Sequence, residues 1–174
     1  KMLSRITTPT SGKISIKGKM ASLLEVGTGF HPELTGRENA YLYGALMGRS
    51  RKQIDELIDE IQSFAELTHH FDRPFRTFSS GMRARLGISV ATAFKPDLLL
   101  IDEVLGVGDV SFREKSQNRV KDLIKTSGSV IIVSHSLAML KDMCTRMILI
   151  EDGEILIDGE PDAVITKYRE VLKN

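Results

Sequence analysis

The sequence predicts an α/β fold in which helices cover a parallel sheet, with a helical segment inserted between its strand-bearing parts. Two continuous apolar runs, Leu98–Ile101 and Val130–Val133, have the length and composition of strands that are buried on both faces. Helical patterns separate these runs, as expected where strands of a parallel sheet alternate with helices. Between residues 34 and 78 the apolar residues recur at helical spacing instead, and this stretch predicts the insert.

The first half of the chain is divided by turn residues and helix-start signals. A turn cluster at residues 7–12 would end a helix over Lys1–Ile6, and alternating residues at Lys13–Lys17 predict an exposed strand. A second strand is expected at Met20–Val26, followed by a loop. Thr35 and Ser50 each precede an apolar-periodic run, so a helix is expected after each of them.

The second half alternates helices and strands. A helix from residues 79–81 to Phe94 leads to the first buried strand, and a polar helix at Phe112–Lys125 leads to the second. Another helix is expected at Leu137–Cys144. Asp152-Gly153 is the strongest hairpin signal in the chain, because this dipeptide suits the tight turns that join antiparallel strands. Pro161 near a first turn predicts a last helix.

Composition narrows the class of protein. The chain has 174 residues, enough for one domain with a sizeable core, and its formal net charge of +1 argues against a primary nucleic-acid-binding role. No apolar run approaches the ~20 residues that span a bilayer, so we expect no direct membrane insertion and any membrane connection to run through a partner. The single cysteine, Cys144, cannot form an internal disulfide and is expected to be a small buried apolar residue.

Two carboxylates directly follow the first buried strand. Asp102 and Glu103 would therefore lie at the carboxyl edge of the sheet, where open α/β sheets bind ligands. One carboxylate can hold Mg²⁺, which retains several waters, and a second can orient or deprotonate an attacking water. A surface loop that happens to be acidic is the alternative.

Two further features suggest a phosphate site. Ser79-Ser80-Gly81 precedes a helix, and backbone N–H groups at a helix N-terminus bind phosphate, although a plain N-cap explains the same residues. His135 follows the second buried strand and would also lie at the carboxyl edge, within reach of a terminal phosphate. A lone histidine is more often structural.

Taken in order, these motifs resemble the ABC ATPase series over essentially the whole chain. Residues 79–82 with Arg85 look like the signature motif, and Leu98–Glu103 looks like Walker B with its catalytic glutamate. Residues 107–109 and His135 are similar to the D-loop and the H-loop. The amino-acid sequence of residues 29–39 and 78–87 most resembles that of ATPases from exporters of polysaccharide, O-antigen and teichoic acid.

The resemblance implies a P-loop NTPase (RecA-like) parallel-sheet core with an inserted ABC α-helical subdomain, lacking its N-terminal strands and P-loop. Residues 1–33 would be the remainder of the N-terminal part of the core and residues 34–78 the helical subdomain. Residues 79–174 would hold the signature helix and the C-terminal part of the core.

The resemblance also implies a role for each matching residue. Asp102 would hold Mg²⁺ through water, with Glu103 as general base and His135 as the sensor of the γ-phosphate. The signature residues would bind ATP held mainly by a second subunit, and Asp109 would lie in the dimer interface. These signature residues are Ser79, Ser80 and Gly81.

The sequence also departs from the family pattern. A P-loop needs Gly, four residues, Gly, Lys and Ser or Thr, and neither Gly12-Lys13 nor Gly18-Lys19 continues in that way. Residues 1–6 resemble the helix that follows a P-loop, so we expect an N-terminally truncated chain whose Walker A loop stood just upstream. This chain alone is then expected to bind ATP poorly and to be inactive as an ATPase.

Two smaller departures concern the nucleotide contacts. The family's Q-loop glutamine is absent, and Glu25 is the expected substitute as a polar contact to metal or water. Ser80 and Met82 replace the glycine and glutamine of the commonest signature. We expect phosphate binding to survive, because Ser80 retains a hydrogen-bonding group.

The resulting hypothesis is the ATP-hydrolysing subunit of an exporter of polysaccharide, O-antigen or teichoic acid. It would act as a homodimer with Mg²⁺ and ATP, and residues 27–39 would receive a coupling helix of a transmembrane permease. It would lie peripherally at the cytoplasmic face of the inner membrane, with no nucleic-acid partner. The alternatives are a hydrolysis-deficient fragment or permease-binding module, and a soluble non-transport ABC ATPase.

Overall fold

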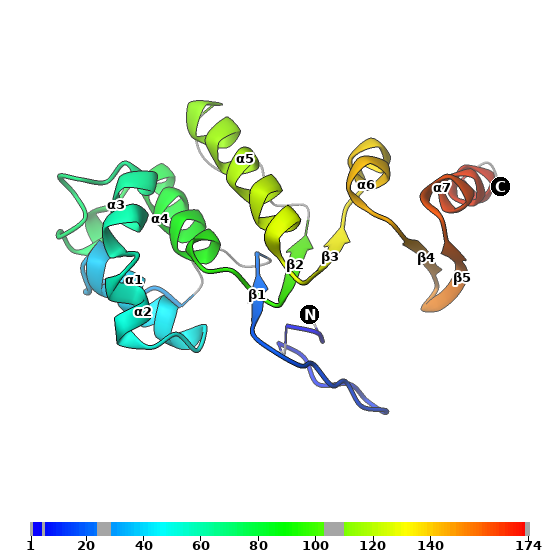
Figure 1. Cartoon of the computed structure of the whole chain (residues 1–174), viewed down its shortest axis with the longest axis horizontal. Coiled ribbons are helices and arrows are strands. Elements are labelled where there is room, and N and C mark those ends of the chain that lie inside the picture. Colours follow the sequence, from blue (N-terminus) through cyan, green and yellow to red (C-terminus); the bar gives the residue numbers. More distant parts are fainter. Residues whose placement is uncertain (1, 5, 24–28, 103–109, 173–174) are drawn as a thin grey trace. The chain divides into compact units, whose positions relative to one another are not determined.

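The computed structural model describes residues 2–4, 6–23, 29–102 and 110–172 (Figure 1). The chain divides into two compact units, Lys1–Ile131 and Ile132–Asn174. The domain boundaries expected after residues 33 and 78 fall inside the first unit and stay a prediction. The predicted α/β class is confirmed, because helices and parallel strands alternate along the first unit.

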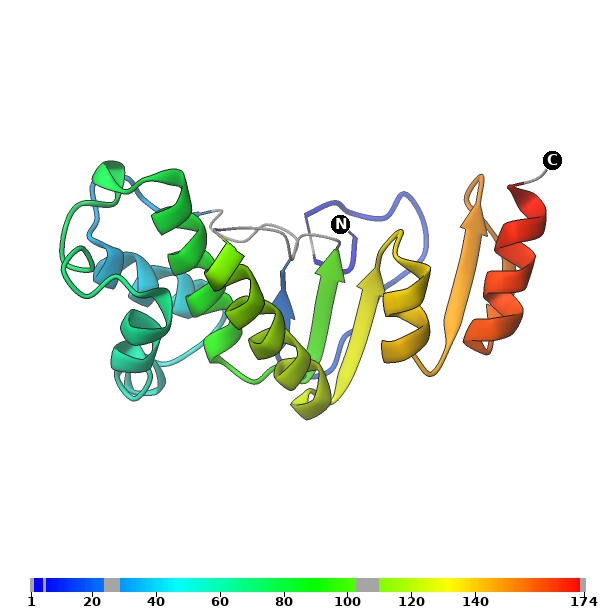
Figure 2. The ribbon, with the colours of Figure 1, turned by 90° about the horizontal axis from the view of Figure 1, so that it is seen from above.

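A three-stranded sheet contains the two apolar runs found in the sequence. Strands β1 (Met20–Ser22), β2 (Leu98–Asp102) and β3 (Ser129–Val133) lie in the order β1-β2-β3 (Figure 2). Strands β1 and β2 are parallel, with Met20 opposite Leu98, and the Leu23 N–H extends the ladder by donating to the Leu100 carbonyl over 2.8 Å. Burial of the apolar side chains of β2 holds this strand inside the sheet.

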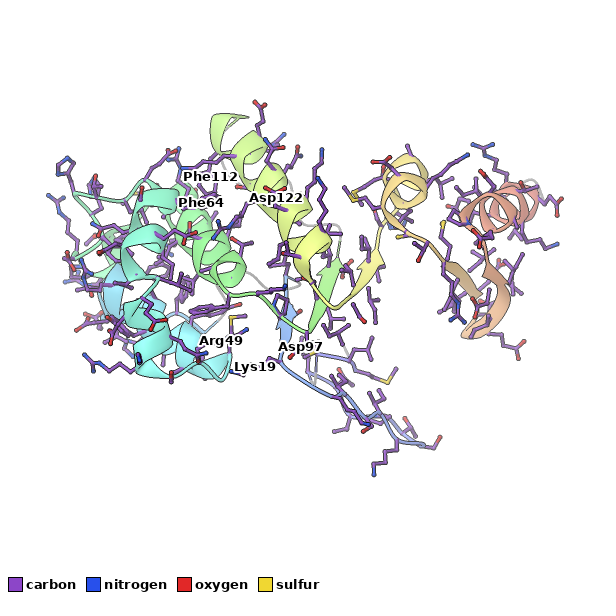
Figure 3. All side chains as sticks on the ribbon, viewed as in Figure 1. Lys19, Arg49, Phe64, Asp97, Phe112 and Asp122 are labelled. Atoms are coloured by element: carbon purple, nitrogen blue, oxygen red, sulfur yellow. The ribbon has the colours of Figure 1, made fainter. Side chains whose placement is uncertain are left out.

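The entry into β1 is fixed by Asp97, directly before β2. The Lys19 N–H donates to Asp97 Oδ2 over 2.7 Å, and the Asp97 N–H donates to the Lys19 carbonyl over 2.8 Å (Figure 3). Gly18 has φ of +94°, and a Cβ there would lie 2.6 Å from Asp97 Oδ2. Only glycine fits both this backbone and this approach, so the start of the parallel pair is well specified.

The predicted helical insert is present. It contains helices α1 (Gly36–Leu46), α2 (Arg51–Asp55) and α3 (Ile58–Ala65) and the 3₁₀ turn η1 (Phe75–Thr77), and it leads into α4 (Ser80–Ala93). These elements share one apolar core, whose buried members are Ala40, Ile54, Ile58, Ile61, Ala65, Leu67, Phe71, Phe75, Phe78, Leu86, Val90 and Phe94.

The helix expected from Ser50 is divided in the structure. Helix α2 ends at Asp55 and α3 begins at Ile58, with Glu56 and Leu57 between them. Ile54 and Ile58 are both buried in the shared core, so both helices present their apolar residues to it. The periodic pattern in the sequence predicted this buried face correctly, although it did not predict the break.

Helix α5 (Val110–Thr126) precedes β3 in the chain, and its Phe112 and Val120 are buried. The second unit contains α6 (Leu137–Met143), the antiparallel strands β4 (Met147–Glu151) and β5 (Glu154–Gly159), and α7 (Pro161–Val171). Asp152 and Gly153 both have positive φ, as the predicted tight hairpin turn requires.

Two predicted elements near the start of the chain are wrong. The described residues of Lys1–Ile6 form a turn rather than a helix, and Lys13–Lys17 has no strand pairing. Residues 6–15 are exposed, so their side chains gain no burial that would stabilise regular structure.

Several strands carry exposed aliphatic side chains. The exposed aliphatic residues on β3, β4 and β5 are Ile131, Val133, Ile148, Ile150, Ile155 and Leu156. Val133 keeps 61% of its surface exposed, although the sequence predicts a strand buried on both faces. The prediction that β3 is buried on both faces is therefore wrong for this structure.

Candidate functional site

The predicted phosphate-binding residues begin the longest helix of the insert core. Ser79 is the N-cap of α4, and its Oγ accepts a hydrogen bond from the Met82 N–H at 3.2 Å. Ser79 and Ser80 are exposed, and Gly81 is half-buried. The first turn of α4 thus presents backbone N–H groups and the positive end of the helix dipole, which favour an anion.

Gly81 is not required by the packing around it. A Cβ at this position would have a single described neighbour within 4 Å, Ser79 Oγ at 3.9 Å. Glycine in a helix lowers its stability by about 1 kcal/mol relative to alanine. An approach of another molecule to this backbone is a physical reason for glycine here, and it agrees with the predicted phosphate site.

Asp102 is the last residue of β2 and is half-buried. The three residues before it are 0–4% exposed, so the strand passes from a dry interior to a carboxylate within one residue. The prediction that Asp102 ends a buried strand is confirmed. A single carboxylate of this kind suits Mg²⁺, which keeps most of its waters.

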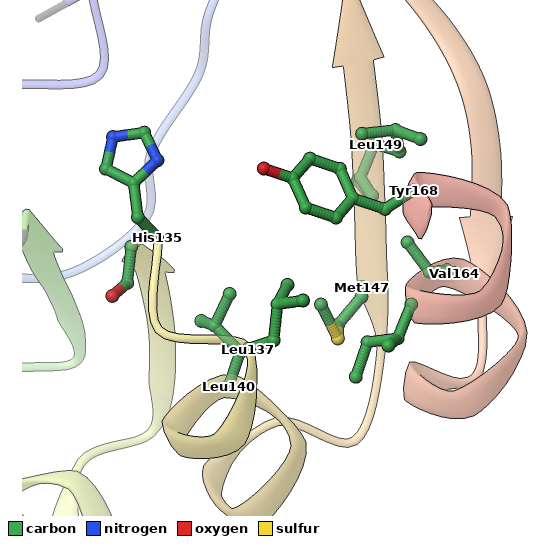
Figure 4. Close-up of a pocket in the computed structure, with 10 residues that line it drawn as sticks. His135, Leu137, Leu140, Met147, Leu149, Val164 and Tyr168 are labelled. Carbon is green, nitrogen blue, oxygen red and sulfur yellow. The ribbon is translucent and has the colours of Figure 1, made fainter. Parts of the chain in front are cut away.

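His135 lies in the second unit, two residues after the end of β3. It is exposed and lines a pocket of about 120 Å³ whose other walls come from α6, β4 and α7. Figure 4 shows the Tyr168 ring within this pocket, with its hydroxyl on the side where His135 lies. The pocket is mainly apolar, with Leu140 and Val164 buried in its walls.

Three predicted site residues lie outside the described residues. They are Glu25, Glu103 and Asp109. His135 belongs to the second unit, whereas Asp102 belongs to the first. The gathering of Asp102, Glu103 and His135 at one edge of the sheet therefore stays a prediction.

Two properties of the described residues bear on the kind of site. Within residues 2–4, 6–23, 29–102 and 110–172, no group of three or more His, Cys, Asp or Glu side chains is arranged to hold a metal ion. Over the same ranges, no helix combines the length and the apolar character needed to cross a bilayer.

Sequence reasoning missed the side chain that shapes residues 31–35. Asn39 is fully buried, and its Oδ1 accepts from the His31 N–H at 2.7 Å. Its Nδ2 donates to the carbonyls of His31, Leu34 and Thr35 over 3.0–3.2 Å. The segment is therefore tied to the first turn of α1. An asparagine just inside a predicted helix start was the available signal.

The N-terminus of α1 adds a second restraint on the same segment. The Thr35 hydroxyl accepts from the Glu38 N–H at 3.1 Å, and the Glu38 carboxylate accepts from the Thr35 N–H at 2.8 Å. This is a capping box. Phe30 packs edge-on against Tyr43 and Phe75, with ring centroids 5.4 and 5.1 Å away. Residues 30–35 thus form a preorganised surface beside α1.

Comparison with known proteins gives the family. The family model described as ABC transporter matches residues 1–106. The O-antigen export system ATP-binding protein RfbB of Klebsiella pneumoniae is 40% identical over 171 residues, covering 98% of this chain and 70% of that protein. The teichoic acids export ATP-binding protein TagH of Enterococcus faecalis is 37% identical over 98% of this chain, which spans 38% of its length.

Solved structures agree on the fold. An ATP-binding subunit of an ABC transporter superposes with a TM-score of 0.68 at 21% identity, covering 86% of this chain and 62% of that one. A dimeric ATP-binding cassette bound to ADP and phosphate gives a TM-score of 0.59 at 22% identity, with 82% of this chain and 63% of that one covered. By its sequence match and its fold, the chain belongs to the ABC transporter family.

Proposed function

We propose that the protein containing these residues is the ATP-hydrolysing subunit of an exporter of polysaccharide, O-antigen or teichoic acid. One observation carries this proposal: 98% of the chain aligns at 40% identity with an O-antigen export ATP-binding protein. The ordered motifs support it, because Ser79–Gly81 begins α4 and Asp102 ends a buried strand, as an ATPase site requires.

Each matched residue has a chemical task in this proposal. Asp102 would hold Mg²⁺, and the bound ion would neutralise charge on the phosphates. Glu103 accepts a proton from the attacking water and orients it toward the γ-phosphate. His135 donates a hydrogen bond to the γ-phosphate and keeps the water in place. Glu25 would be a polar contact to the metal or its water.

The phosphate-binding turn of α4 serves a second subunit. Ser79 caps the helix and thereby leaves the N–H groups of Ser80 and Gly81 for the γ-phosphate of ATP held mainly by the opposite copy. Asp109 lies at the contact between the copies. This arrangement requires a homodimer, so hydrolysis depends on association.

The preorganised segment 30–35 takes part in docking of the permease. This segment is part of residues 27–39, which with α1 receive a coupling helix of the transmembrane subunit. A surface already fixed by Asn39 loses little conformational freedom on binding, which favours affinity. The protein then lies peripherally at the cytoplasmic face of the membrane.

The proposal is tested on the full protein with its permease. Glu103→Gln should lower the Mg²⁺-dependent ATPase rate at least about 100-fold, the loss typical of a missing general base. Binding of ATP, measured by isothermal titration, should persist. Surface polysaccharide should be lost from cells that carry the variant.

Glu114→Gln is the matched control, because Glu114 is an exposed glutamate on α5. It should leave hydrolysis and export unchanged. Hydrolysis that survives Glu103→Gln would overturn the assigned general base. A wild-type protein that hydrolyses no ATP with its permease present would overturn the proposed function.

A further inference from the structure

Glu66 has an unusual backbone conformation at the end of α3. It is the C-cap residue, with φ of 56° and ψ of 39°, which is the left-handed helical region. Helices commonly end this way, but the residue in that region is usually glycine, because a Cβ is strained there. The presence of glutamate therefore calls for a role of its side chain.

The Glu66 carboxylate joins two other helices. Its Oε1 accepts from Lys115 Nζ of α5 at 3.0 Å, and its Oε2 pairs with the Arg85 guanidinium of α4. Lys115 Nζ also donates to the Phe64 carbonyl, near the end of α3, over 2.9 Å. One carboxylate thus connects the end of α3 with both α4 and α5.

An aromatic pair lies beside this carboxylate and holds the two cations. The Phe64 and Phe112 rings meet edge-on with centroids 5.7 Å apart, at the contact between α3 and α5 (Figure 3). Lys115 Nζ lies 4.7 Å from the centre of the Phe64 ring, and the Arg85 guanidinium lies 5.0 Å from that of Phe112. Cation–π attraction fixes both cations where the carboxylate meets them.

The two helices joined by Glu66, α4 and α5, are each next in sequence to residues of the proposed ATP site. Arg85 lies six residues after Ser79, so it belongs to the helix whose first turn is the phosphate site. Lys115 lies near the start of α5, which follows the segment that contains Glu103 and Asp109. Under the proposed function, a link between α4 and α5 therefore ties the phosphate-binding turn, which serves the ATP of the opposite copy, to the segment that contains this copy's own base and its Asp109 contact.

We propose that Glu66 is a positioning residue for ATP hydrolysis, which sets α4 relative to α5 by bridging Arg85 and Lys115. This inference rests on the proposed function. In-line attack on a phosphate needs the donors of one copy and the base of the other in register, so the position of α4 relative to α5 within each copy affects both sites of the homodimer. A misplacement of about 1 Å can lower the rate about 100-fold. Glu66 does not touch the nucleotide and acts through the two helices.

The electrostatics of the cluster agree with this role. The hydrogen bond from Lys115, reinforced by Arg85, holds the pKa of the Glu66 carboxyl below its ordinary value, against the opposing effect of burial. Glu66 therefore stays ionised at neutral pH, and both bridges persist.

The decisive experiment uses Glu66→Gly in the full protein with its permease. Glycine relieves the backbone strain at positive φ, so the thermal midpoint should be unchanged or higher. Both bridges are lost, so kcat should fall about tenfold or more while KM for ATP changes less than about twofold. A merely structural C-cap would give full activity with unchanged or higher stability, and that result overturns the inference.

Lys115→Met removes the α5 side of the bridge without a change at Glu66. It should lower kcat by a similar factor, and the double variant with Glu66→Gly should be no slower than the slower single variant. If the decreases in kcat of the two single variants multiply in the double variant, the two residues act independently and the inference is overturned. This comparison of single and double variants stays informative even where Glu66→Gly lowers stability. Glu60→Gln is the matched control, because it removes an ion pair between α3 and Arg119 of α5 that does not include α4. It should keep the wild-type kcat.

A second readout separates this inference from the proposed function. Hydrogen–deuterium exchange of the Phe112–Ser116 amides of α5 should quicken in Glu66→Gly and not in Glu60→Gln. If the wild-type protein hydrolyses no ATP, the proposed function fails, and quicker exchange still supports the bridge. Unchanged exchange in α5 overturns the bridge whatever the activity.

Discussion

Replacing Asn39 should destabilise the first unit more than any single surface change. Asn39→Ala removes one hydrogen bond to the His31 N–H and three to backbone carbonyls. Because the amide has two N–H donors for three carbonyls, the contacts amount to about three full hydrogen bonds, and a net value of about 1 kcal/mol each gives a total of about 3 kcal/mol. His31 is exposed, so water can replace part of this loss. We therefore expect a decrease of about 2–3 kcal/mol in the free energy of unfolding.

Urea unfolding followed by far-UV circular dichroism measures this change, with Asn118→Ala as control. Asn118 is an exposed asparagine on α5, and alanine there should change the free energy of unfolding by less than about 0.5 kcal/mol. Asn39→Asp keeps the acceptor for the His31 N–H but turns a carboxylate toward three carbonyls, so it should be no more stable than Asn39→Ala. A loss below about 0.5 kcal/mol for Asn39→Ala would refute the reasoning from buried hydrogen bonds.

Four further outcomes are expected. Gly36→Ala should destabilise by about 1–3 kcal/mol in urea unfolding, because a Cβ there would lie 2.9 Å from both the Phe71 carbonyl oxygen and the Phe78 ring. Thr35→Ala should lower the free energy of unfolding by about 1 kcal/mol through loss of the capping box. The hydrogen bond from Arg37 lowers the pKa of Asp72, so this carboxylate stabilises the fold above its ordinary pKa and the effect is lost as pH falls through the lowered value. The stability advantage of wild type over Asp72→Asn should accordingly be full at neutral pH and vanish in strong acid, as urea midpoints across pH would reveal. Burial raises the pKa of the Cys144 thiol, so iodoacetamide should modify it more slowly at pH 8 than it modifies the same thiol in urea.

Local patterns in the sequence specified most of the elements. The capping residues Thr35 and Ser50, the apolar run of β2 and the Asp152-Gly153 turn each predict a feature that depends on neighbours in sequence, and each is present. The order of the motifs then led to the family, which the comparisons confirm. Asp102 and the Ser79 N-cap lie where the motifs predict them.

Features that depend on tertiary contacts could not be predicted from the sequence. Glu66 reads as an ordinary solvated helix residue, because its partners Arg85 and Lys115 lie 19 and 49 residues away. The exposure of β3 was missed for a similar reason, since an apolar run gives composition but not the neighbours that cover it. The expected strand at Lys13–Lys17 failed because alternation alone provides no pairing partner.

The aliphatic side chains exposed on β3, β4 and β5 have a practical consequence at the bench. Strands with exposed aliphatic side chains tend to associate with one another in concentrated samples. Residues 1–174 by themselves should therefore self-associate at high concentration. Light scattering over a dilution series should accompany every calorimetric or kinetic measurement on these residues. A monomeric sample must be demonstrated before any dimer seen with nucleotide is assigned to catalysis.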